Sequence, residues 1–288
     1  MSKRKGRLDD GDANLPRYTV GVVAQRLGVP IATLRSWNQR YGIGPTGHNP
    51  GRHRLYSEAD IAMVEQMHKL IAAGASPHSA ARAALDVVVP PRADTDSLLA
   101  AAFDLDLVSA SRQLERHLRH YGVVETWDQL IRPAFSVIET KQTGGDRCID
   151  VEHALSWAVS RSLNRLPINA LDKTASVILA CTEGETHTLA VEALRAALGE
   201  HGRGALMLGA DVPCAALIDA IGRTAHPATV LLWAQTAGTA DVAVTKAMIA
   251  ARAQVMVAGP GWQSARLPKK AVRVDSLVGA VQLLRDDV

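Results

Sequence analysis

The residues best suited to chemistry lie in the segment GETHTLA, residues 184–190, where Glu185 stands two residues before a single histidine, His187. The segment follows an apolar run and precedes a helical pattern, so it marks the point where a strand ends and a helix begins. Imidazole is the commonest protein ligand of metal ions, and a carboxylate often orients a ligating histidine through its other ring nitrogen. The sequence therefore allows three interpretations of His187: a metal ligand oriented by Glu185, a helix cap, or a surface residue.

Classical metal sites do not fit the rest of the sequence. A zinc site needs three or four ligands, and neither a CxxC nor an HxxxH pattern accompanies His187. The three cysteines, Cys148, Cys181 and Cys214, are far apart, which indicates buried, reduced thiols in a cytoplasmic protein and not a disulfide framework. If His187 binds a metal, the other ligands must come from a cofactor, which indicates a macrocycle.

The elements around His187 predict an α/β domain over residues 174–288. Helical patterns separate four short apolar runs, ASVILACT, GALMLGA, ATVLLWA and QVMVAG, and a last strand, AVRV, and a helix close the chain. This alternation predicts a parallel sheet covered on both faces, and such sheets bind ligands at the carboxyl ends of their strands. Residues 95–167 instead show four amphipathic helical patterns, which predict a small helix bundle after a proline-containing linker over 86–94.

The charge distribution sets the N-terminal part apart from the rest. Residues 1–90 carry 12 Lys and Arg against 7 Asp and Glu, whereas the remainder carries 20 against 22. Residues 17–56 contain six arginines and no acidic residue, which is typical of a module that binds a polyanion. Residues 1–16 lack the apolar segment of a secretory signal and are expected to form a disordered arm. No apolar run approaches the roughly 20 residues of a membrane helix, so we expect no membrane association.

The basic module, residues 17–86, has the order of a helix-turn-helix. The stretch LGVPIATLRSWNQRYG contains the end of one helix, a turn and a second helix, and the turn-rich loop that follows could be a hairpin. Together, YTVGVVAQRLGVPIATLRSWNQRYG and PGRHRLYSEADI resemble the MerR-type winged helix-turn-helix. The resemblance implies a dimer on double-stranded operator DNA, with the second helix in the major groove and the wing on phosphates. The candidate DNA-binding residues are Thr19, Thr33, Arg35, Trp37, Arg40, Tyr41, Arg52, His53, Arg54 and Tyr56.

A second resemblance covers the rest of the chain. A Glu-x-His segment after the first strand of a flavodoxin-like (Rossmann-like) sheet, behind a four-helix bundle, resembles the cobalamin-binding module of methionine synthase and of the CarH/LitR regulators. The resemblance implies that His187 is the lower cobalt ligand of a bound adenosylcobalamin or methylcobalamin and displaces its dimethylbenzimidazole tail. The further candidate cofactor-binding residues are Gln142, Glu152, His153, Glu185, Thr188, Ala234, Thr236, Gly259 and Gly261.

This chain departs from the cobalamin pattern at three places. Ala190 replaces the glycine that ends the histidine motif, and WAQTAGT (233–239) matches the Ser-x-Leu loop only weakly. The light-sensing members carry a Trp-x9-Glu-His signature, of which Glu152 and His153 are present while Lys141 and Gln142 stand where the tryptophan would be.

The sequence thus predicts a multidomain transcriptional regulator with an all-α winged helix-turn-helix, a four-helix bundle and an α/β sheet domain. The first hypothesis is a repressor that senses a cobalamin, with light as one signal, acts as a dimer or tetramer, and competes with RNA polymerase for promoters. The alternative is a regulator whose cobalamin-like domain is degenerate and serves dimerisation or another ligand or protein signal. An enzyme is not expected, because the sequence contains no P-loop, nucleophile elbow or paired-carboxylate motif.

Overall fold

The structure is a computed structural model that describes residues 17–45, 55–87, 94–166, 176–224 and 227–286. Contacts divide the chain into two compact units, Met1–Pro91 and Arg92–Val288. No helix within the described ranges is both long and apolar enough to cross a membrane.

The described residues of the first unit form four helices. They are α1 (Val20–Leu27), α2 (Ile31–Tyr41), α3 (Glu58–Ala72) and α4 (Pro77–Val87). Glycines end the first two as the sequence predicts, because Gly28 and Gly42 adopt the left-handed conformation that side chains disfavour. A capping box of Ser57 and Asp60 starts α3. An antiparallel bridge between Tyr18 and Tyr56 closes the unit.

The helical part of the second unit contains α5 (Thr95–Phe103), α6 (Leu107–Thr126), α7 (Arg132–Thr143) and α8 (Ile149–Asn164). A five-residue π-helix, Trp127–Ile131, joins α6 to α7. Gly122 interrupts α6 with a φ of 76°, and the carboxylate of Glu200 accepts hydrogen bonds from the Val123 amide at 3.0 and 3.1 Å. A side chain from the sheet domain therefore caps the second half of a bundle helix.

The sheet of the second unit has five parallel strands in the order β2-β1-β3-β4-β5. The strands are β1 (Val177–Thr182), β2 (Leu206–Val212), β3 (Thr229–Trp233), β4 (Gln254–Ala258) and β5 (Ala271–Val274). Each coincides with one of the five predicted strands, so the predicted α/β fold is confirmed. The order makes the crevice between β1 and β3 the topological switch point, where ligands bind in folds of this kind.

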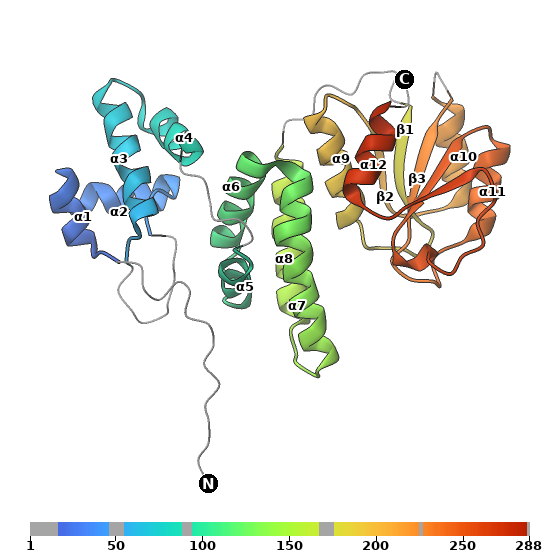
Figure 1. Ribbon diagram of the computed structural model, residues 1–288, viewed down its shortest axis with the longest axis horizontal. Helices are drawn as coiled ribbons and strands as arrows, with labels where there is room; N and C mark the ends of the chain where they lie inside the picture. The colour runs from blue at the N-terminus through green and yellow to red at the C-terminus, as the bar shows by residue number, and fades with distance from the viewer. Residues whose placement is uncertain (1–16, 46–54, 88–93, 167–175, 225–226, 287–288) are drawn as a thin grey trace, which may run out of the picture. The chain divides into compact units, whose positions relative to one another are not determined.

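Helices cover both faces of the sheet (Figure 1). They are α9 (Leu189–Glu200), α10 (Cys214–Gly222), α11 (Val242–Ala250) and α12 (Leu277–Asp286), with a short 3₁₀ turn at Pro260–Trp262. Alternate residues of β1 point to opposite faces of the sheet and enter different hydrophobic cores. One core contains the bundle, α9 and α12, and receives Val177, Leu179 and Cys181. The other lies under α10 and α11 and receives Ile178 and Ala180. The bundle and one face of the sheet thus share a single hydrophobic core.

Candidate functional site

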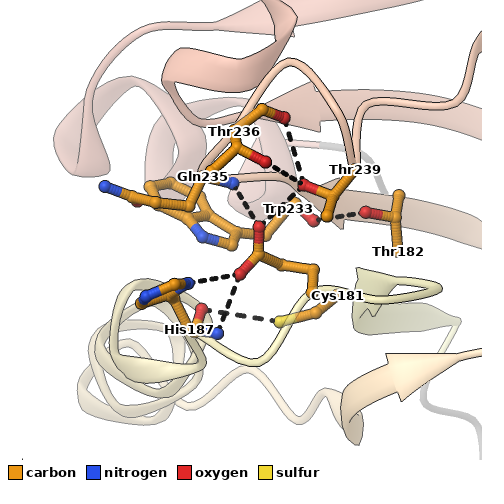
Figure 2. Close-up of polar contacts among 8 residues, drawn as sticks. Cys181, Thr182, His187, Trp233, Gln235, Thr236 and Thr239 are labelled. Carbon is orange, nitrogen blue, oxygen red and sulfur yellow. Dashed lines mark hydrogen bonds and ion pairs between the residues drawn. The ribbon is translucent and has the colours of Figure 1, made fainter.

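The site is built on the loop between β1 and α9, around the carboxylate of Glu185. This side chain is 1% exposed, and its Oε1 atom accepts a 2.9 Å hydrogen bond from the His187 amide. The same oxygen lies 2.5 Å from Nδ1 of the His187 ring (Figure 2). The carboxylate therefore fixes both the backbone and the ring of the histidine, as the sequence analysis predicts for an oriented ligand.

The second carboxylate oxygen ties this loop to the one that follows β3. Glu185 Oε2 accepts hydrogen bonds from the Gln235 amide at 2.7 Å and from the Thr239 hydroxyl at 2.8 Å (Figure 2). Burial alone raises the pKa of Glu185, but hydrogen bonds from the amides of His187 and Gln235 and from the side chains of His187 and Thr239 outweigh it and lower the pKa to about 2. Glu185 is therefore a buried, ionised acceptor with four donors, located at the switch point.

The geometry leaves one atom of His187 available for coordination. Because the ionised carboxylate accepts from Nδ1, the Nε2 atom is the one that can bind a metal, and the side chain is 59% exposed. Among the described residues, no group of three or more His, Cys, Asp or Glu side chains could hold a metal ion. A metal bound at His187 would therefore need most of its ligands from elsewhere, as a macrocycle provides.

A hydrogen-bond donor without an acceptor lies close to this loop. Trp233 ends β3, pairs with Cys181 in the sheet register, and packs against the core shared with the bundle. Its Nε1–H is buried and has no partner within the described chain. In Figure 2 the indole lies on the same side of the carboxylate as the His187 ring. Because buried donors are nearly always satisfied, this N–H fits a bound group that carries an acceptor.

The glycines of the β4 loop pack tightly against the loop after β3. A Cβ atom on Gly259 would lie 2.3 Å from the Ala234 carbonyl oxygen, and one on Gly261 would lie 2.2 Å from the Thr236 carbonyl oxygen. The close backbone approach at these glycines is therefore made at least by the chain's own β3 loop, and their contact with a nucleotide stays a prediction. Ala234 is also buried, so its methyl group is a core group, whereas Thr236 is exposed on this loop.

Two of the candidate cofactor-binding residues in the helix bundle contact each other. Gln142 Nε2 donates a 2.7 Å hydrogen bond to Glu152 Oε2, which joins the end of α7 to the start of α8, and His153 is exposed beside them. No hydrogen bond within the described chain joins this pair to His187. Thr188, in contrast, follows His187 directly and donates to Glu192 Oε1 at 2.7 Å.

Sequence reasoning missed Gln235, Thr239 and Glu192. The first two contact Glu185 across 50 and 54 residues of chain, so no local spacing indicates them. Glu192 joins α9 to the bundle, because its Oε2 atom accepts from Ser160 at 2.5 Å and from Asn164 at 3.3 Å. For Gln235 and Thr239, the only signal in the sequence is that WAQTAGT follows a predicted strand whose carboxyl end lies at the same edge of the sheet as that of β1.

In the first unit the predicted DNA-binding residues fall into two groups. Arg35 and Arg40 are exposed on α2, and Thr33 and Tyr41 are partly buried there. Trp37 and Tyr56 are buried in the core of the unit and Thr19 caps α1, so these three position the helices, and their contact with DNA stays a prediction. Arg52, His53 and Arg54, the predicted wing residues, lie outside the described residues.

Comparison with known proteins identifies the first unit. Residues 18–85 match the MerR HTH family regulatory protein. The chain is also similar to the HTH-type transcriptional repressor CarH of Myxococcus xanthus, at 25% identity over 214 residues that cover 68% of this chain and 72% of CarH. The repressor CarA of the same organism is 28% identical over 221 residues, which cover 69% of this chain and 70% of CarA.

The first unit carries a MerR-type helix-turn-helix, and the chain is a DNA-binding transcriptional regulator. The matches to CarH and CarA cover more of this chain than the first unit contains, so the similarity extends into the second unit. The fold of the second unit of the regulator is also that of the Methanosarcina barkeri monomethylamine corrinoid protein, with a TM-score of 0.50 and 11% identity over 66% of this chain and 95% of that chain.

Proposed function

We propose that the regulator is a repressor that senses a cobalamin through its second unit, with Nε2 of His187 as the lower cobalt ligand. The observation that carries the proposal is the contact of His187 Nδ1 with the buried, ionised carboxylate of Glu185, which leaves Nε2 on an exposed ring. A corrin ring supplies the four equatorial nitrogens that a lone histidine cannot. The likeness to proteins named as repressors and the fold of a corrinoid protein support the same proposal.

The residues present fit such a cofactor at the switch point. Glu185, held by Gln235 and Thr239, orients the imidazole, and the unsatisfied indole N–H of Trp233 offers a donor to the amide groups of a corrin. When bound, cobalamin supplies a coloured cobalt centre whose upper ligand changes with its chemical state. We expect the bound cobalamin to be adenosylcobalamin or methylcobalamin.

On the DNA side, the exposed guanidinium groups of Arg35 and Arg40 meet operator DNA. Arginine suits phosphate oxygens and guanine edges because it presents paired donors in a fixed plane. Two such units in a homo-oligomer, a dimer or tetramer, occupy two half-sites and gain avidity. Repression then follows from competition with RNA polymerase at the promoter.

The test is a binding spectrum measured in the dark. The full chain is incubated with adenosylcobalamin or methylcobalamin, desalted, and its visible spectrum is recorded before and after illumination. The proposal expects a retained, base-off spectrum for the natural chain and for the His201→Ala control, which removes an exposed imidazole after the far end of α9. His187→Ala should lose the colour. A natural chain that stays colourless would refute cobalamin sensing and leave only the DNA-binding function.

The second candidate function is a regulator whose sheet domain binds no corrin and serves dimerisation or another signal. The observations in its favour are the tight fit of Gly259 and Gly261 on the chain's own β3 loop, the Gln142–Glu152 pair, and Ala190 in place of glycine. The same experiment separates the two functions. In this case the chain stays colourless and His187→Ala leaves operator affinity unchanged.

A further inference from the structure

Strand β2 has an unusual backbone conformation at Asp211. Among the described residues, Leu105, Asp211 and Arg252 have a positive φ without being glycine, and the φ of Asp211 is 49°. Leu105 and Arg252 lie two residues after the ends of α5 and α11, where a left-handed residue is an ordinary helix ending. Asp211 instead lies inside a strand, where this conformation is strained and persists only if other contacts hold it.

Irregular pairing between β1 and β2 brings Asp211 to the end of β1. Ala180 of β1 pairs with Gly209 of β2. Thr182 pairs with Val212, so two steps along β1 match three steps along β2. The extra residue makes a β-bulge, and bulges redirect the side chains around them. Asp211 directly precedes Val212, so it lies beside the loop that leaves β1 after Thr182.

Asp211 contacts this loop through two hydrogen bonds. Its Oδ1 atom accepts from the Gly184 amide at 2.6 Å. Its own amide donates to the Glu185 carbonyl oxygen at 2.8 Å. The two bonds therefore fix the backbone on both sides of the peptide bond that joins Gly184 to Glu185.

Glu185 is thus held from both strands that flank β1. The sheet order places β2 on one side of β1 and β3 on the other. Asp211 of β2 fixes the main chain of Glu185. Gln235 and Thr239, which follow β3, fix its carboxylate. Because a carboxylate is held no better than the main chain that carries it, the orientation of His187 depends on Asp211.

We propose that Asp211 is a positioning residue for the cobalt ligand His187, and that it acts through the main chain of Glu185 without touching the cofactor. The inference rests on the proposed function, because it needs cobalt at His187. The side chain of Asp211 is exposed, so core packing does not explain its strained conformation, whereas the two bonds to the loop do. Outer partners of this kind keep a metal ligand in place.

The first measurement uses the full chain without cofactor, labelled with ¹⁵N at histidine. The Nδ1–H of His187 donates to the carboxylate of Glu185, so it should give an imidazole proton NMR signal that exchanges slowly with water. His187→Ala assigns the signal by removing it. Asp211→Gly tolerates the positive φ and removes only the acceptor, so the signal should broaden or disappear.

Two further variants show whether the acceptor is what matters. Asp211→Asn removes the charge but keeps an acceptor oxygen and tolerates the left-handed conformation, so it should keep the signal. Asp219→Asn removes the same charge from an exposed position on α10 and is the control. Circular dichroism verifies that all variants fold, as expected for exposed positions.

The second measurement is the dissociation constant for methylcobalamin in the dark. Asp211→Gly should bind about tenfold more weakly than the natural chain, the lower end of the usual cost of removing an outer partner of a metal ligand. Asp211→Asn and Asp219→Asn should bind as the natural chain does.

Three results would overturn the inference: an unchanged imidazole signal in Asp211→Gly, unchanged methylcobalamin affinity in that variant, or equal losses in Asp211→Gly and Asp211→Asn. The first two would show that His187 keeps its place without Asp211, and the third would assign the effect to charge. A natural chain that binds no cobalamin would overturn the proposed function instead, and the signal of the cofactor-free chain would still show whether Asp211 holds His187.

Discussion

The Oε1 atom of Glu185 lies 2.5 Å from Nδ1 of His187, and the same carboxylate holds the loop after β3 through Gln235 and Thr239. One buried side chain therefore both orients the imidazole and fixes the two loops that flank the switch point of the sheet. This relationship links the fold of the second unit to its proposed chemistry.

Glu185→Gln should weaken cobalamin binding about 10- to 100-fold, the usual cost of removing the partner of a metal-ligating histidine. The amide keeps the size of the side chain but cannot accept from all four donors. Titration followed by visible absorbance measures the effect. Glu183→Gln, two residues earlier and exposed, is the matched control and should bind as the natural chain does. Equal affinities for both variants would show that the carboxylate does not orient a ligand.

The low pKa of Glu185 predicts how stability depends on pH. Its pKa of about 2 in the folded chain lies below the usual value of 4.5, so ionised Glu185 stabilises the fold above pH 4.5 and this contribution disappears as the pH falls towards 2. The shift corresponds to about 3 kcal/mol. Urea unfolding from pH 3 to 7 should show that the advantage of the natural chain over Glu185→Gln is constant above about pH 5 and shrinks below it. Parallel stability curves down to pH 3 would contradict the assignment.

Gly261→Ala should destabilise the second unit, because the added methyl group would lie 2.2 Å from the Thr236 carbonyl oxygen and 2.9 Å from that of Ala234. Forced repacking of this kind costs about 1–3 kcal/mol. Gly222→Ala is the comparison, since a Cβ there meets nothing within 4 Å at the end of α10, and its replacement should be neutral or stabilising by up to about 1 kcal/mol. Melting temperatures test the pair, and equal values would disprove the tight loop contact.

Arg35→Ala should weaken operator binding by about 1–3 kcal/mol if the guanidinium group contacts a base. Arg82→Ala removes the same charge from the exposed side of α4 and serves as the control. Fluorescence anisotropy with operator and random DNA, at several salt concentrations, distinguishes a base contact from a phosphate contact. Equal losses on both DNAs would assign Arg35 to the phosphates.

The sequence predicted the order of elements well, because their patterns are local. The apolar runs predicted all five strands, and the glycines after the helical patterns predicted where α1 and α2 end. The pairing of Glu185 with His187 was predicted for the same reason, since only two residues separate them. The burial of Trp37 and the tight packing of Gly261 against the β3 loop could not be predicted, because both depend on tertiary packing.

The contact between α8 and α9 could not be predicted either. Ser160 on α8 donates a 2.5 Å hydrogen bond to Glu192 on α9, and 32 residues separate the two along the chain. Such relationships require the relative position of two helices, which hydrophobic periodicity does not encode.

The most direct test of the account is the electron paramagnetic resonance spectrum of cob(II)alamin bound to uniformly ¹⁵N-labelled protein. A cobalt(II) centre couples to the nucleus of its lower nitrogen ligand, which is ¹⁵N if it comes from the protein and ¹⁴N if it comes from the cofactor tail. We expect each cobalt line to split into a doublet that comes from His187, held in place by Glu185, so His187→Ala removes the doublet. A triplet from the unlabelled dimethylbenzimidazole, unchanged by labelling the protein, would contradict it.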